Sequence, residues 1–347
     1  MIGQPDHEPE NVHSFSVDFG ESSDDGTRQP EAAQNPTLAV APLVPAENPW
    51  EGDQLAGEQP QEHPMFQNWY VPPPRPPVRI PHFGHLGILL VFILSGLFAA
   101  GILMAIAVRF HLFGVTSMQR AVADMDIRFA LGSEIVVYFV MFAACLLFFP
   151  MIWHKGYFEG VHWNGMTALH LRWQLIVTAA ICFVLALVNS LLLPSPKNAP
   201  IDKIFHTPGA PWWLFAFGIT FAPFFEETIF RGFILPAFCT GCDWINEKFT
   251  HAPVRPLDEH GHPQWSFAAM VIGSLVTSIM FAFMHAAQTG YSLGPFILLI
   301  GVSAVLCWAL LSTRSLAASV LVHASYNFLL FSIMMLGTSG FRHLDKL

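Results

Sequence analysis

The feature that most constrains this chain is a series of apolar runs of about 20 residues, the length that an α-helix needs to cross the roughly 30 Å core of a bilayer. Hydrophobic residues make up 53% of the 347 residues and charged residues only 12%, whereas about a quarter of the residues in soluble domains are charged. We therefore predict an all-α, polytopic transmembrane helix bundle. About seven spans are expected, at 86–108, 129–153, 173–193, 212–238, 267–287, 293–311 and 316–336. An eighth crossing stays open if one run is broken.

The chain ahead of these runs has a different composition. Residues 1–79 are rich in Pro, Glu, Gln and Asn and lack apolar periodicity, so they cannot bury enough surface to offset the entropy cost of ordering. We predict a disordered, acidic, Pro-rich tail at 1–79, N-terminal transmembrane helices at 80–211, a transmembrane core at 212–336 and a short polar tail at 337–347. The formal net charge is −9, and acidic residues crowd the first tail, which argues against nucleic acid as a partner.

Three charged residues lie inside the fourth apolar run, where an ionisable group costs about 2.5 to 3.5 kcal/mol on insertion scales. They are Glu226, Glu227 and Arg231. On a helix Glu227 and Arg231 are four residues apart and share a face, so we expect them to form an ion pair. Glu226 points about 100° away, without a partner in its own helix. Pro223 lies just ahead and is expected to kink the helix.

Most of the other strongly polar groups in the apolar runs also lie in the C-terminal half of the chain. His285 lies in the fifth run, one turn after Phe281, and His323 and Asn327 lie four residues apart in the seventh. Residues with this spacing share a helix face, so these groups can converge with the glutamates on one water-filled pocket. The exception is Glu134 in the second run, which we interpret as an acid that reaches the membrane interface.

A carboxylate, two imidazoles and a carboxamide in a dry pocket are groups that can hydrolyse an amide. A desolvated Glu226 can take a proton from water, and His285 can hold that water and share the proton. His323 and Asn327 can donate hydrogen bonds to the oxyanion as it forms. In this interpretation, the Glu227 ion pair supports the helix and the field around Glu226.

Metal binding is a second interpretation of the same groups. Glu226, His285 and His323 can bind Zn²⁺ and leave one coordination position for water. A separate polar excursion at 239–264 also contains potential ligands, but a single Cys-x-x-Cys pair is a weak signal. These ligands are Cys239, Cys242, His251, His260 and His262. Neither a zinc-dependent nor a metal-free mechanism is excluded by the residues alone.

Three motifs follow one another in the apolar runs: Glu226-Glu227-x-x-Phe230-Arg231, Phe281-x-x-x-His285 and His323-x-x-x-Asn327. In this order they resemble the motifs of the CPBP (ABI) intramembrane proteases, which include type II CAAX prenyl endopeptidases and bacteriocin-processing or immunity proteins. The resemblance covers roughly 215–331. It implies that Glu226 and His285 activate water and that His323 and Asn327 stabilise the oxyanion. Members of the family are commonly labelled metalloproteases, although a metal-free, glutamate-dependent mechanism has been favoured for the prenyl enzymes.

We therefore expect an intramembrane endopeptidase that hydrolyses a peptide bond near or within the bilayer. Its expected partners are the lipid bilayer and a peptide or protein substrate, for which the resemblance includes prenylated CAAX peptides. The expected location is the plasma membrane in a prokaryote and the endoplasmic reticulum in a eukaryote. Two alternatives stay open: a non-catalytic immunity or scaffold protein of the same family, and a proton- or ion-coupled transporter, in which intramembrane acids and histidines are equally natural.

Overall fold

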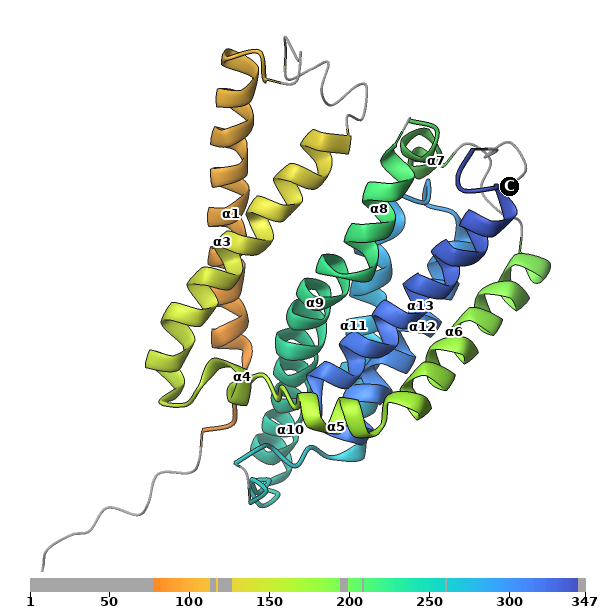
Figure 1. Cartoon of the computed structure of the whole chain (residues 1–347). Helices are drawn as coiled ribbons and strands as arrows, with labels where there is room; N and C mark the ends of the chain where they lie inside the picture. Colours follow the sequence, from red (N-terminus) through yellow and green to blue (C-terminus); the bar gives the residue numbers. More distant parts are fainter. Residues whose placement is uncertain are drawn as a thin grey trace, which may run out of the picture. The chain divides into compact units, whose positions relative to one another are not determined.

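The computed structural model describes residues 78–112, 117, 127–193, 199–207, 209–259 and 261–342 (Figure 1). Within these residues the regular elements are all helical, and the only β-type pairing is an isolated bridge between Leu257 and Pro263. The all-α prediction is therefore confirmed for the described part of the chain. The predicted disordered tail lies outside the described residues, except for its last two positions.

Six helices of the described chain are long and apolar enough to span a membrane, and each coincides with a predicted span to within three residues at either end. They are α1 (Phe83–Arg109), α3 (Ile127–Trp153), α6 (Arg172–Leu192), α11 (Phe267–Ala286), α12 (Leu293–Thr313) and α13 (Leu316–Gly337). Short helices lie between them: α4 (Tyr157–Gly160), α5 (Gly165–His170) and α7 (Pro200–Phe205). The length and apolar composition of the six long helices make the chain a multi-pass membrane protein.

The remaining predicted span, 212–238, is a broken helix. It consists of α8 (Ala210–Ile219), α9 (Phe221–Glu227), the π-helix η3 (Thr228–Ile234) and α10 (Leu235–Thr250). The axis bends by 43° between α8 and α9, at Thr220, whose φ of −120° and ψ of −78° are not helical. The bundle has seven spans if this bent pair is one crossing.

The break lies one turn ahead of Pro223, where we had expected the kink. A proline ring inside a helix clashes with the carbonyl four residues earlier, which here is that of Ile219, the last residue of α8. The helix restarts at Phe221, so Pro223 lies in the first turn of α9. A missing backbone N–H is tolerated there because the first N–H groups of a helix have no partner within it.

Helix α13 brings the C-terminal polar residues to the broken span. It packs against α5, α6, α8, α9 and α12, and also contacts η3. The start of α13 is fixed by the α4–α5 region, since the Leu316 N–H donates to the His162 carbonyl at 2.9 Å and the Ser315 hydroxyl donates to the Asn164 carbonyl at 2.7 Å. Helix α6 also packs against α12. The predicted N-terminal group at 80–211 thus shares an interface with the core at 212–336.

Candidate active site

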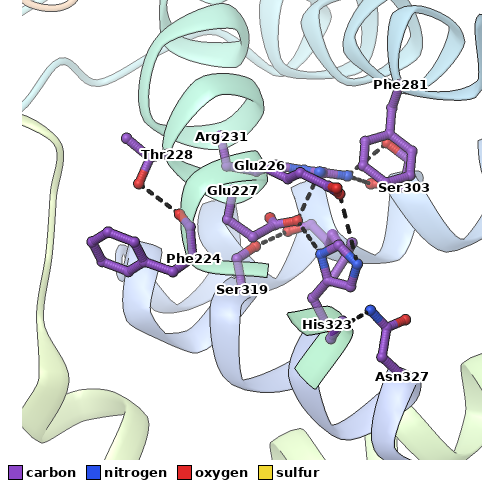
Figure 2. A network of polar contacts seen from close by, with 12 residues as sticks. Phe224, Glu226, Glu227, Thr228, Arg231, Phe281, Ser303, Ser319, His323 and Asn327 are labelled. Atoms are coloured by element: carbon purple, nitrogen blue, oxygen red, sulfur yellow. Dashed lines mark hydrogen bonds and ion pairs between the residues drawn. The ribbon is translucent and has the colours of Figure 1, made fainter. Parts of the chain in front are cut away.

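The predicted ion pair lies at the end of α9 and is completely buried. Glu227 and Arg231 both have side chains that are 0% exposed, and Arg231 Nη1 donates to Glu227 Oε1 at 2.9 Å. Arg231 Nη2 also donates to Ser303 of α12, to its carbonyl at 2.9 Å and to its hydroxyl at 2.6 Å (Figure 2). The prediction of this pair from the four-residue spacing is confirmed, and Ser303 is a partner that the sequence did not indicate.

His323 joins this buried pair to the more open side of the site. Its Nδ1 lies 2.8 Å from Glu227 Oε1. An ionised carboxylate only accepts hydrogen bonds, so Nδ1 carries the proton, and Nε2 of the neutral ring has a free lone pair. This Nε2 lies 4.0 Å from Glu226 Oε2. His323 therefore contacts one glutamate directly and faces the other across a short gap (Figure 2).

His285 has the same arrangement from α11. Its Nδ1 lies 2.9 Å from the Phe281 carbonyl oxygen. A carbonyl can only accept, so this nitrogen is the donor and Nε2 of the neutral ring is the acceptor. Nε2 lies 3.8 Å from Glu226 Oε1. The Phe281 ring lies 4.5 Å from the His285 ring and 6.0 Å from the His323 ring, so it walls the space beside both imidazoles.

Glu226 thus lies between two imidazole nitrogens. Separations of 3.8 and 4.0 Å are too long for direct hydrogen bonds, so a water molecule beside these atoms can bridge them. The four facing atoms, the two Glu226 oxygens and the two Nε2 atoms, are all acceptors when the rings are neutral, which suits a water that donates its protons. The side chains of Glu226 and His285 are 14% and 22% exposed, so water can reach them.

Asn327 has a backbone partner that the sequence did not indicate. Its Nδ2 donates to the Gly218 carbonyl at 2.7 Å, close to the break after α8. A helix end leaves its last carbonyls without intrahelical partners, and Asn327 satisfies one of them. Among the described residues it has no hydrogen bond to Glu226 or to either imidazole, although one N–H of its carboxamide stays available.

Glu134 was interpreted as an interfacial acid, but the structure places it near the site. Its Oε1 accepts a hydrogen bond of 2.9 Å from the Tyr138 hydroxyl, and its carboxylate interacts electrostatically with Glu226 and His285. The Tyr138 ring stacks on Phe225, with ring centroids 4.7 Å apart. Glu134 and Tyr138 are four residues apart on α3, a spacing that could have suggested this hydrogen bond but not its proximity to Glu226.

The predicted zinc ligands are not arranged for a metal. In the described chain no three His, Cys, Asp or Glu side chains form a group that could hold a metal ion. The separations of 3.8 and 4.0 Å around Glu226 exceed the roughly 3.3 Å between neighbouring ligands of a tetrahedral zinc. In the polar excursion, Cys239 and Cys242 are free thiols, and His260 lies outside the described residues. The donor types suit zinc but their placement does not, so we derive no step through a metal.

An apolar crevice lies next to the site, between α3 and the broken span. Its volume is about 430 Å³, and its walls include Leu131 and Ile135 from α3 and Phe217 and Phe221 from either side of the break. Tyr138, one turn beyond Ile135 on α3, stacks on Phe217 as well as on Phe225, the residue before Glu226. Tyr138 therefore links the crevice wall at Phe217 to Phe225, the residue before Glu226.

Comparison with known protein families supports the resemblance drawn from the motifs. Residues 208–329 match the family model described as type II CAAX prenyl endopeptidase Rce1-like. The matched segment contains the three ordered motifs and runs from just before α8 into α13. The curated proteins and the solved structures gave no match. Residues 208–329 are thus similar to the Rce1-like type II CAAX prenyl endopeptidases, the family that the three motifs resemble.

Proposed function

We propose that the chain is a membrane endopeptidase that uses a water molecule held between Glu226, His285 and His323. The observation that carries this proposal is the position of the Glu226 carboxylate, 3.8 and 4.0 Å from the two Nε2 atoms, within the segment that matches a protease family. The site is partly open to water beside Glu226 and His285, whereas the buried Glu227–Arg231 ion pair closes the opposite side.

Glu226 is the general base of the proposed reaction. It takes one proton from the water, while His285 accepts a hydrogen bond from the other proton and orients the water oxygen. That oxygen bonds to the carbonyl carbon of the substrate, and the π electrons of the carbonyl move to its oxygen. Glu226 then gives the proton to the leaving nitrogen as the carbon–nitrogen bond breaks, which yields a carboxylic acid and an amine.

Hydrogen-bond donors to the oxyanion come from α13. The carboxamide of Asn327 uses one N–H for Gly218 and has a second for the oxyanion. His323 donates from Nδ1 to Glu227. Its Nε2 accepts from the water when the ring is neutral and donates to the oxyanion only when the ring is an imidazolium, with the buried carboxylate as its counter-ion. Removing one such donor typically slows a reaction by about 100- to 1,000-fold.

The proposed substrate is a peptide that carries a hydrocarbon modification, as in CAAX processing. The apolar crevice of about 430 Å³ supports this choice, because a hydrocarbon group gains binding free energy when a concave, apolar surface removes it from water. A group seated there places the attached peptide close to Glu226. Metal binding is not part of the proposal.

The test uses the full chain in liposomes and two peptides of the same sequence, one prenylated at cysteine and one not. We expect cleavage of the prenylated peptide and slower cleavage of the other. Glu226→Gln keeps the size of the side chain but removes the base, and should reduce cleavage by about 100- to 10,000-fold. Glu159→Gln, on the half-exposed helix α4, is the matched control and should cleave normally. No cleavage of either peptide by the folded wild type, or full cleavage by Glu226→Gln, would contradict the proposal.

A further inference from the structure

Glu134 is a second carboxylate beside the proposed reaction site, and the mechanism above does not use it. It lies within the membrane-spanning helix α3, is half-buried, and accepts a hydrogen bond from Tyr138 at 2.9 Å. The Tyr138 ring is buried and stacks on Phe217 at 6.3 Å and on Phe225 at 4.7 Å. These contacts fix the tyrosine against the break between α8 and α9, and the tyrosine in turn holds the carboxylate.

Glu134 shares its favourable electrostatic partner with Glu226. Its carboxylate is attracted to His285, which also faces Glu226, and no Lys or Arg in the described chain forms an ion pair with either glutamate. The one arginine of the site, Arg231, is already bound to Glu227 and Ser303. The carboxylates of Glu134 and Glu226 repel each other electrostatically. Ionisable groups are costly inside a membrane and normally have a partner, so a cation from outside the chain would relieve an unfavourable arrangement.

The position of Glu134 indicates where that cation would come from. Leu131 and Ile135, one turn before and directly after Glu134, line the apolar crevice, and Tyr138 continues from there to Phe225 beside Glu226. Glu134 therefore lies beside the residues that line the crevice, which include Arg128 on the same helix, and is linked through Tyr138 to Phe225. A substrate that extends from the crevice to Glu226 can pass this carboxylate.

We propose that Glu134, held by Tyr138, determines specificity by binding a cationic group of the substrate next to the scissile bond. This inference rests on the proposed endopeptidase function and adds the charge of the substrate to it. The site would prefer a peptide with a lysine or arginine at the position that faces Glu134 and would discriminate against one with an acidic residue there. Glu134 contacts the substrate but takes no part in proton transfer.

The experiment uses the full chain in vesicles of uncharged phosphatidylcholine, so that the membrane surface does not concentrate one peptide over another. Three prenylated peptides differ only in a Lys, Gln or Glu at one position that flanks the scissile bond, and a set is made for each flank. Cleavage is measured as kcat/KM for the wild type, Glu134→Gln and Glu159→Gln. Binding of the same peptides is measured by fluorescence anisotropy with His285→Gln, which keeps both carboxylates, alone and combined with Glu134→Gln.

For one flank, we expect the wild type to favour Lys over Glu by about 10- to 100-fold, as for a charged hydrogen bond. Glu134→Gln keeps the shape of the side chain and can still accept from Tyr138, but should lose this ranking. Glu159→Gln removes the same charge elsewhere and should keep the ranking. The binding assay should give the same order.

Two results would overturn the inference: no ranking by the wild type on either flank, or an unchanged ranking in Glu134→Gln. The first needs no variant, so it decides the matter even if Glu134→Gln does not fold. The binding assay separates this inference from the proposed function. If no peptide is cleaved but the Lys peptide binds best and only with Glu134 present, the endopeptidase proposal is wrong and the role of Glu134 in binding stands.

Discussion

Two neighbouring glutamates on one turn of α9 have opposite surroundings. Glu227 is completely buried and is bound by Arg231 at 2.9 Å and by His323 at 2.8 Å. Glu226 is 14% exposed, and its nearest charged or ionisable partners lie 3.8 and 4.0 Å away. We call these the closed side and the open side of the site. The comparison teaches that direct hydrogen bonds to Glu227 Oε1 fix the helix on one side, and that the wider separations around Glu226 leave room for water on the other.

The largest effect should follow from breaking the closed side. Arg231→Met removes the cation and leaves the Glu227 carboxylate buried without its main partner, which typically costs about 3 to 5 kcal/mol. We expect a lower midpoint of thermal unfolding in detergent. The double variant Glu227→Gln/Arg231→Met removes both charges and should recover part of this loss. If Arg231→Met unfolds at the temperature of the wild type, the closed side does not support the fold as described.

Substituting each histidine in turn should distinguish the closed side from the open side. His323 faces both glutamates, whereas His285 faces Glu226. His285→Ala and His323→Ala should each abolish cleavage. Only His323→Ala should also destabilise the protein, by about 1 to 3 kcal/mol, since it leaves a buried acceptor of Glu227 without its donor. The measurement is the rate of cleavage and the unfolding midpoint of the same preparations. Equal loss of stability in both variants would contradict the distinction between the sides.

Ser303→Ala should have a smaller effect, confined to the closed side. It removes the hydroxyl that accepts from Arg231 Nη2 at 2.6 Å but keeps the backbone carbonyl that accepts from the same nitrogen. We expect a loss of about 1 kcal/mol in the free energy of unfolding and a nearly normal cleavage rate. Ser312→Ala, on the exposed face of α12, is the control. A large loss of rate in Ser303→Ala with normal stability would place Ser303 in the reaction instead.

The smallest effect should come from removing metal ions. The groups on the open side are spaced too widely for a zinc ion, so we expect cleavage to continue after treatment with a membrane-permeant chelator. Metal analysis of the same sample checks that it is metal-free. Loss of cleavage that is restored by added Zn²⁺ would show that the open side rearranges around a metal, and would replace the water-only mechanism.

The sequence predicted those features that depend on length and on near neighbours. The spans follow from apolar length, and the Glu227–Arg231 pair follows from its four-residue spacing, so both were found. Pro223 was expected to kink the helix, and the break lies three residues before it, at Thr220, since a proline acts on the carbonyl four residues before it. The partners Ser303, Gly218 and Tyr138–Phe225 were not found because they depend on the packing of distant helices. The protonated nitrogens of the histidines likewise depend on those contacts.

The most direct test of the account is a paired measurement on Glu226→Gln and Glu227→Gln, with cleavage of the prenylated peptide and thermal unfolding recorded for each. The account predicts that Glu226→Gln unfolds like the wild type but cleaves about 100- to 10,000-fold more slowly, whereas Glu227→Gln unfolds at a lower temperature. Cleavage at the wild-type rate by folded Glu226→Gln would contradict the claim that this carboxylate activates the water.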